Sequence, residues 1–203
     1  MNRNFFITST TVLFFCLFSY AQDTDSDKDT YRNQGFFNIS KISFGKSNKI
    51  KQEVFISGEG NFFSDLDTAG SDTWSFQTIN GFFLSPSFSL GIGIGLENHD
   101  NPDFNVLPLF LDARAYFSDD GESLYTFLDI GPTIKLDGNE SGLNKGVIFN
   151  LGIGYKFQVA DNLFLVSDAF FSHKTVSLTD EGIGKSDNIV KVNGLGLSLG
   201  VIF

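Results

Sequence analysis

The segment FSLGIGIGL, residues 88–96, decides the fold class because it alternates large apolar residues with small ones without a break. Successive side chains of a β-strand point to opposite faces, so this period of two puts Phe, Leu and Ile on one face and Ser and Gly on the other. A helix would need an apolar period near 3.6, and repeated glycines would destabilise it. The segment is therefore predicted to be a strand with one fully apolar face.

The same alternation recurs along most of the chain, and no segment after the amino terminus shows a helical period. It is clearest in five segments: residues 88–96, 107–117, 124–136, 147–159 and 194–203. Residues 73–85 and 163–179 are strand-like with a less regular phase, and Asn80-Gly81 is a candidate bulge. Alternating segments of about ten residues separated by turns are typical of transmembrane β-barrels.

The composition of the second face distinguishes a membrane barrel from a soluble one. A soluble barrel points its apolar face inward and carries charges outside. Here the polar face is mostly Gly, Ser and Asn with a few charges of both signs, which suits a narrow and crowded interior. The apolar face is uninterrupted, as a lipid-facing band must be. A lipocalin-like soluble barrel has the same period and stays open as an alternative.

The connections indicate an outer-membrane barrel, in which short periplasmic turns alternate with longer outer loops. The short ones are residues 85–87, 118–123 and 160–162, and the longer, more polar ones are residues 99–103, 137–145 and 180–188. An even number of strands is required, so we take residues 36–45 as the first of about eight. Residues 46–72 are then a long first outer loop, with residues 54–56 extended. The reverse assignment, with residues 52–63 as the first strand, stays open.

The first 21 residues have the organisation of a signal peptide. Arg3 supplies a positive charge, residues 5–18 form an apolar run too short to span a bilayer, and residues 19–21 fit a cleavage site. Residues 22–34 are acidic and polar, which predicts a flexible lead-in. The remaining chain, residues 35–203, is expected to form the barrel in the outer membrane.

Together these features resemble the small OmpA/OmpX-type outer-membrane barrels. The resemblance rests on the signal peptide, the alternating strands and the terminal GLGLSLGVIF (194–203); QTINGFFLSPSFSLGIGIGL (77–96) and LPLFLDARAYF (107–117) are similar to uncharacterised small barrels of Gram-negative bacteria. It implies that the barrel-insertion machinery recognises the last strand, which ends in Phe203, and that no periplasmic domain follows. The fold serves structural, adhesive, receptor and enzymatic roles, so the resemblance specifies no activity.

Charged residues on the inward phase of the predicted strands are the candidate site. They are Asp112, Arg114, Asp129, Lys156 and Asp168, each a few residues from a short turn. The interior of an eight-stranded barrel is filled by side chains rather than by water, so charges there must be paired. We interpret the five as a structural ion-pair cluster; a proton or ion path is the alternative. Either way, the filled interior predicts no substantial pore.

Composition excludes several other functions. The formal net charge of −10 argues against a nucleic-acid partner, because neutralising phosphates requires a basic surface. With 2 His and 1 Cys, neither a zinc cluster nor a disulfide framework is expected, and we predict no metal and no cofactor. His99 is expected in a solvated loop, and the loop carboxylates, which lack EF-hand spacing, would attract divalent cations at most weakly.

The sequence therefore predicts a structural or surface-binding protein rather than an enzyme, with recognition through acidic outer loops on a rigid scaffold. The expected partners are outer-membrane lipids, lipopolysaccharide and the insertion machinery, and the protein is expected to be a monomer. The alternative is a lipid-modifying enzyme. His173 falls on the outward phase, as in outer-membrane lipid A deacylases, but Thr175 stands where a serine is needed and no acidic partner is evident on that face.

Overall fold

The structure is a computed structural model, and the regular elements within its described residues are all β-strands. It describes residues 33–56, 58–118, 122–136, 146–160, 162–177 and 187–203. The predicted signal peptide and most of the predicted lead-in lie outside these residues. In the part of the chain that is described, no helix is long and apolar enough to cross a membrane.

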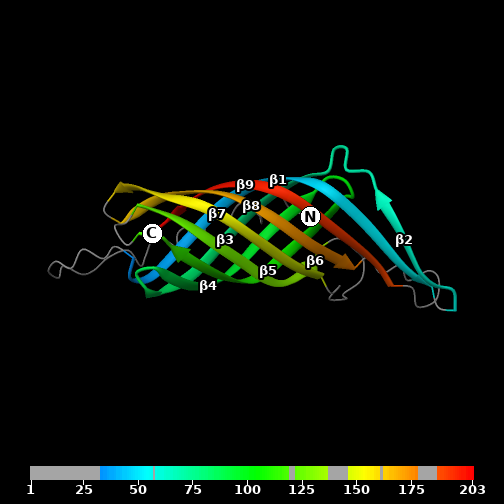
Figure 1. Ribbon diagram of the computed structural model, residues 1–203, viewed down its shortest axis with the longest axis horizontal. Helices are drawn as coiled ribbons and strands as arrows, with labels where there is room; N and C mark the ends of the chain where they lie inside the picture. Colours follow the sequence, from blue (N-terminus) through cyan, green and yellow to red (C-terminus); the bar gives the residue numbers. More distant parts are fainter. Residues whose placement is uncertain (1–32, 57, 119–121, 137–145, 161, 178–186) are drawn as a thin grey trace, which may run out of the picture. The chain divides into compact units, whose positions relative to one another are not determined.

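Nine strands form one antiparallel sheet. They are β1 (Gly35–Ile56), β2 (Gly60–Leu66), β3 (Asp72–Ser85), β4 (Phe88–His99), β5 (Phe104–Tyr116), β6 (Ser123–Lys135), β7 (Gly146–Ala160), β8 (Leu163–Ser177) and β9 (Asp187–Ile202). Consecutive strands pair from β3 to β9, and β1 pairs with both β3 and β9. The β1–β9 pairing closes these eight strands into a barrel, while β2 pairs with β1 alone among the described strands (Figure 1). The predicted closed barrel of about eight strands is confirmed.

The first strand is longer than expected. β1 continues for 22 residues, and β2 folds back along its outer part so that Ile56 lies opposite Gly60. The prediction of a loop over residues 46–72 is therefore wrong, because only residues 67–71 connect β2 to β3. Residues 52–63 are divided between the end of β1 and the start of β2. Beyond the membrane a strand needs no apolar face, so this outer part lacks the alternation that marks the other strands.

Large apolar side chains cover the outside of the barrel. In β4, Ile92 is 60% exposed while the glycines on either side of it are buried. In β9, Leu195, Leu197 and Leu199 are each 61–66% exposed. A soluble barrel would bury these side chains, whereas a lipid-facing wall requires them outside. The outward apolar band was predicted correctly, and the soluble alternative does not fit.

Inside the barrel, aromatic rings lie opposite glycines of the neighbouring strand. The pairs in register are Phe37–Gly81, Phe110–Gly93, Tyr125–Gly154, Phe127–Gly152 and Phe170–Gly196. A Cβ at any of these five glycines would lie within 2.6 Å of the ring opposite. These glycines therefore provide the space that the rings occupy, which explains five of the 21 Gly of the chain.

Two smaller sequence predictions are wrong: the bulge at Asn80-Gly81 and the regular alternation of short and long connections. The pairing of β3 with β4 is regular at Gly81, and the irregularity lies between Phe83 and Ser85 instead. The lengths of the connections do not alternate strictly, because residues 100–103 form a shorter connection than residues 117–122. The strand ends that the longer connections join nevertheless lie at one end of the barrel, as predicted, and the β1–β2 hairpin lies at the same end. We call this the loop end and the opposite one the turn end.

We expect Gly93→Ala to destabilise the barrel by about 1–3 kcal/mol, the usual cost of overpacking. The added Cβ would lie 2.3 Å from the ring of Phe110. Urea unfolding in lipid vesicles, followed by the fluorescence of Trp74, the single tryptophan, measures the change. Gly45→Ala is the control, because its Cβ would meet no atom closer than 3.6 Å. A double variant, Gly93→Ala/Phe110→Leu, that regains no stability would show that the ring is not the cause.

Candidate functional site in the barrel interior

A charged cluster fills the half of the interior nearer the turn end. The alternation of the strands turns Asp112 and Arg114 of β5, Asp129 of β6, Lys156 of β7 and Asp168 of β8 inward. Each of these residues is at most 2% exposed. The structure thus brings all five residues singled out from the sequence into the interior, and the contacts of each decide how its charge is compensated.

Arg114 is paired with its neighbour on the same face of β5. Its Nε donates to both carboxylate oxygens of Asp112, at 2.9 and 3.1 Å. The guanidinium lies over the rings of Tyr125 and Phe127, with centroids 5.1 and 5.2 Å away. A cation over an aromatic face is stabilised by the ring quadrupole, more strongly when both are desolvated. One carboxylate and two rings therefore enclose this charge.

Lys41 of β1 connects the other two carboxylates, and the sequence analysis missed it. Its Nζ lies 3.5 Å from Asp168 Oδ2 and 3.9 Å from Asp129 Oδ2. Asp168 also accepts hydrogen bonds from the hydroxyls of Tyr125 and Ser198, the latter at 2.7 Å. Lys41 lies on the inward phase of β1, so the period of two that found the other charges could have found it too.

Lys156 is held without a carboxylate among the residues that the structure describes. Its Nζ donates to the side-chain oxygen of Asn33. It also lies over three rings, at 4.6 Å from the centroid of Phe164, 5.2 Å from Tyr116 and 5.9 Å from Phe83. The amide nitrogen of Asn33 in turn donates to a carbonyl of the β3–β4 turn at 2.9 Å. Asn33, assigned to the lead-in from the sequence, is fully buried and covers the turn end of the interior.

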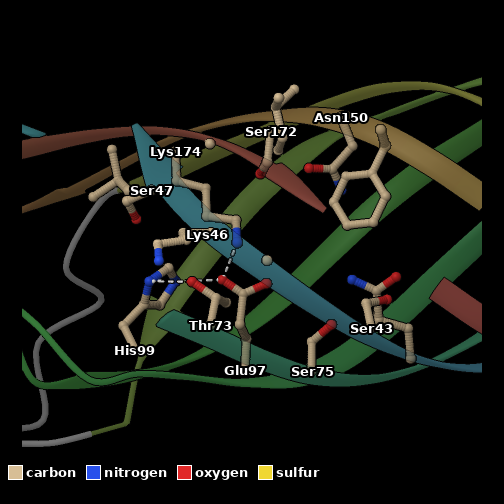
Figure 2. Close-up of a pocket in the computed structure, with 16 residues that line it drawn as sticks. Ser43, Lys46, Ser47, Thr73, Ser75, Glu97, His99, Asn150, Ser172 and Lys174 are labelled. Carbon is tan, nitrogen blue, oxygen red and sulfur yellow. Dashed lines mark hydrogen bonds and ion pairs between the residues drawn. The ribbon is translucent and has the colours of Figure 1, made fainter. Parts of the chain in front are cut away.

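A second polar cluster lies nearer the loop end and was not found from the sequence. Glu97 accepts a hydrogen bond from Lys174 Nζ and is joined to His99 Nε2 by a 2.5 Å hydrogen bond (Figure 2). His99 Nδ1 lies 2.9 Å from the Thr73 hydroxyl. The prediction of a solvated His99 is wrong, because β4 continues three residues past Leu96 and its alternation turns Glu97 and His99 inward.

The second cluster borders a cavity of about 30 Å³. Polar side chains line much of it, among them Ser43, Ser75, Asn150 and Ser172 (Figure 2). A water needs about 10–15 Å³, so the cavity is large enough for about two. Toward the turn end the interior is packed with rings such as Phe37, Phe110 and Phe127. Toward the loop end an apolar layer consists of Ile50, Phe104, Val106, Val176, Val190 and Val192.

His173, on which the enzymatic alternative depends, lies on the outside of β8. Its Nδ1 is 2.5 Å from the side-chain oxygen of Asn193 on β9. The Thr175 hydroxyl accepts a hydrogen bond from the backbone N–H of Val147 at 3.1 Å. Nucleophilic catalysis requires a hydroxyl hydrogen-bonded to its base. Within the described ranges His173 has no such hydroxyl partner, and no group of three or more His, Cys, Asp or Glu residues could hold a metal ion.

Phe203, the predicted insertion signal, lies at the turn end of the β1–β9 junction. Its N–H donates to the carbonyl of Asn38 at 3.0 Å, and the N–H of Asn38 donates to the Phe203 carbonyl at 2.8 Å. Its ring is 38% exposed on the outside. The last residue thus completes the pairing that closes the barrel, and its recognition by insertion machinery stays a prediction.

No protein-family model matches the sequence, and no curated protein matches it. Among solved structures the barrel is similar to Neisserial surface protein A (NspA), with a TM-score of 0.54, 15% identity and coverage of 83% of this chain and 96% of that one. It is also similar to the outer membrane protein OprG from Pseudomonas aeruginosa, with a TM-score of 0.55, 12% identity and coverage of 86% and 98%. The fold is that of a small outer-membrane β-barrel. The exposed apolar band agrees with that location in the outer membrane.

We expect Arg114→Met to destabilise the barrel by about 3–5 kcal/mol, because Asp112 would be left buried without its cation. Denaturant unfolding in vesicles measures the loss. Arg114→Met/Asp112→Asn should recover part of it, since both charges are then absent. Lys191→Met is the matched control: its 2.8 Å ion pair with Glu53 is partly exposed and should contribute at most about 1 kcal/mol. Equal losses at the two sites would contradict the interpretation.

Proposed function

We propose that this protein is a non-enzymatic surface-binding barrel that forms no substantial pore and binds its partner through the β1–β2 hairpin. We define the recognition hairpin as residues 50–66. The observation that carries the proposal is that this hairpin presents exposed aromatic and acidic side chains at the loop end, while side chains fill the described interior.

The recognition hairpin exposes aromatic rings on both of its faces. β2 pairs with β1 from Ile50–Leu66 to Ile56–Gly60 and forms the edge of the described sheet, while β9 accompanies β1 on its other side as far as Asp187 opposite Phe55 (Figure 1). Phe62 is 50% exposed and Phe63, on the opposite face, is 69% exposed. Outside the membrane, exposed aromatic side chains of this kind mark interaction sites, where buried rings contribute most of the binding energy.

Acidic side chains accompany these rings. Glu59 lies at the tip of the recognition hairpin, Asp65 lies on β2 and Asp67 follows it directly. The whole chain has a net charge of −10, so these carboxylates add to an overall charge that favours cations. A ligand that is complementary to both features is cationic and amphipathic, such as a basic peptide segment with apolar residues.

The proposal predicts no stable ohmic conductance when the protein is reconstituted in planar bilayers. In the described part of the interior, a cavity of about 30 Å³ lies between the apolar layer at the loop end and the rings toward the turn end. A porin reconstituted in the same way serves as the positive control. Large, long-lived conductance steps that scale with salt concentration would contradict a filled interior.

Binding by the recognition hairpin is tested with a fluorescent amphipathic peptide of lysine and leucine and the purified protein in nanodiscs of neutral lipid. Phe62→Ser/Phe63→Ser should weaken binding, measured by anisotropy, by about tenfold or more. Glu59→Gln/Asp65→Asn should weaken it and reduce its salt dependence. Phe117→Ser is the control, because that ring is 71% exposed but lies at the turn end. If the hairpin variants bind like the wild type, the proposed function is wrong.

A further inference from the structure

The lipid-facing wall is hollowed over β7, β8, β9 and β1. The groove measures about 620 Å³, within the range of about 300–1,000 Å³ typical of small-molecule sites. Its lining is apolar apart from one residue, Lys46. Because this surface faces hydrocarbon, one acyl chain can enter an apolar hollow of this size while the surrounding acyl chains contact the barrel wall outside it.

The register of the four strands explains the hollow. One row of outward side chains across β7, β8, β9 and β1 consists of Ile153, Ala169, Leu197 and Phe44. The next row toward the loop end consists of Leu151, Phe171, Leu195 and Lys46. Ala169 is the single small side chain in its row, so the larger residues around it form the walls of the groove. An empty hollow would lose dispersion contacts, which favours an occupant.

Lysines gather directly beyond the groove on the side of the loop end. We define the lysine patch as Lys46, Lys49, Lys51 and Lys191. The row that follows Phe171 and Leu195 is polar and places His173 beside Asn193 and Lys49. In a chain with 14 Lys and Arg in all, four lysines thus lie close together on one face of two neighbouring strands.

Part of the lysine patch is compensated and part is not. Lys191 forms a 2.8 Å ion pair with Glu53, and Lys51 lies opposite Asp65 in register. Lys46 likewise lies opposite Asp72, but none of Lys46, Lys49 and Lys51 forms a salt bridge with any residue that the structure describes. Lys46 and Lys49 are the two of these exposed lysines that lie nearest to the rim of the apolar groove.

We propose that the groove and the lysine patch together bind a phosphorylated lipid of the outer leaflet. One acyl chain lies in the hollow at Ala169, and the phosphate is held by Lys46 and Lys49. The two apolar rows end where the polar row begins. A lipid with its acyl chain in the groove would therefore place its headgroup beside the lysines. This site lies on the barrel wall. It shares Lys51 with the recognition hairpin, but the groove, Lys46 and Lys49 lie outside the hairpin, so the site does not depend on the function proposed there.

Trp74 is a built-in reporter for this site. It packs against Phe44, which lines the groove, with ring centroids 4.8 Å apart, and it is the single tryptophan of the chain. The purified protein is reconstituted in phosphatidylcholine vesicles containing increasing fractions of phosphatidic acid brominated on its acyl chains. Brominated phosphatidylcholine is the neutral comparison. Bromine quenches tryptophan on contact, so quenching reports which lipid occupies the wall beside Phe44.

Phosphatidic acid should reach half-maximal quenching at a lower fraction than phosphatidylcholine, by about fivefold for each lysine engaged. The preference should decrease with added salt, because the lysines are exposed. Lys46→Gln/Lys49→Gln should remove most of it, whereas Lys46→Arg/Lys49→Arg should retain it. Equal quenching by the two lipids, or a preference that survives the glutamine substitutions, would overturn the proposal.

The groove is tested separately from the charges. Ala169→Leu fills the hollow and should reduce the preference for phosphatidic acid. Ala113→Leu is the matched control, because Ala113 is also a small outward residue beside leucines but belongs to β5, outside the groove. If Ala169→Leu behaves like Ala113→Leu, the lysines merely attract any anion to the membrane surface and the site inferred here does not exist.

Discussion

The pairing of β1 with β9 is the interaction on which the rest of the structure depends. In hydrocarbon every backbone N–H and C=O must find a partner within the protein, and an open sheet would leave two unpaired edges there. The register runs from Ile39–Ile202 to Phe55–Asp187 with one irregularity, between Ser47 and Lys49. With the two edges paired, the outward face can be apolar throughout. The inward face then encloses an interior that is filled mainly by the side chains of the strands themselves.

The interior of the barrel is narrow, and this determines how side chains fill it. Rings and glycines oppose each other across the strands, so bulk on one strand is matched by its absence on the next. The same rings then contribute to charge compensation: Phe127 lies beside both Lys41 and Arg114, and the ring of Phe164 is the nearest to Lys156. The interior therefore tolerates buried cations with the help of aromatic faces as well as carboxylates.

The period of two was enough to predict the barrel, its lipid-facing side and the inward direction of Asp112 or Lys156. Inside the membrane one face of each strand contacts lipid and the other faces the packed interior, so the two faces differ in composition. It fails where strands leave the membrane. The outer part of β1 and the end of β4 near His99 carry polar residues on both faces, such as Lys49 and Asn98 on the outward face, so the apolar alternation disappears there. The groove at Ala169 was also beyond sequence reasoning, because it depends on the register of four strands, which pairs residues far apart in the chain.

The lysine patch takes residues from both sides of the junction that closes the sheet, Lys46 and Lys49 from β1 and Lys191 from β9. These strands are the first and last of the barrel, and bringing chain ends together costs more conformational entropy than forming any of the hairpins. The patch therefore exists only once the barrel has closed. A ligand that binds the closed form alone stabilises it by mass action, so a lipid bound there would also stabilise the closure of the barrel.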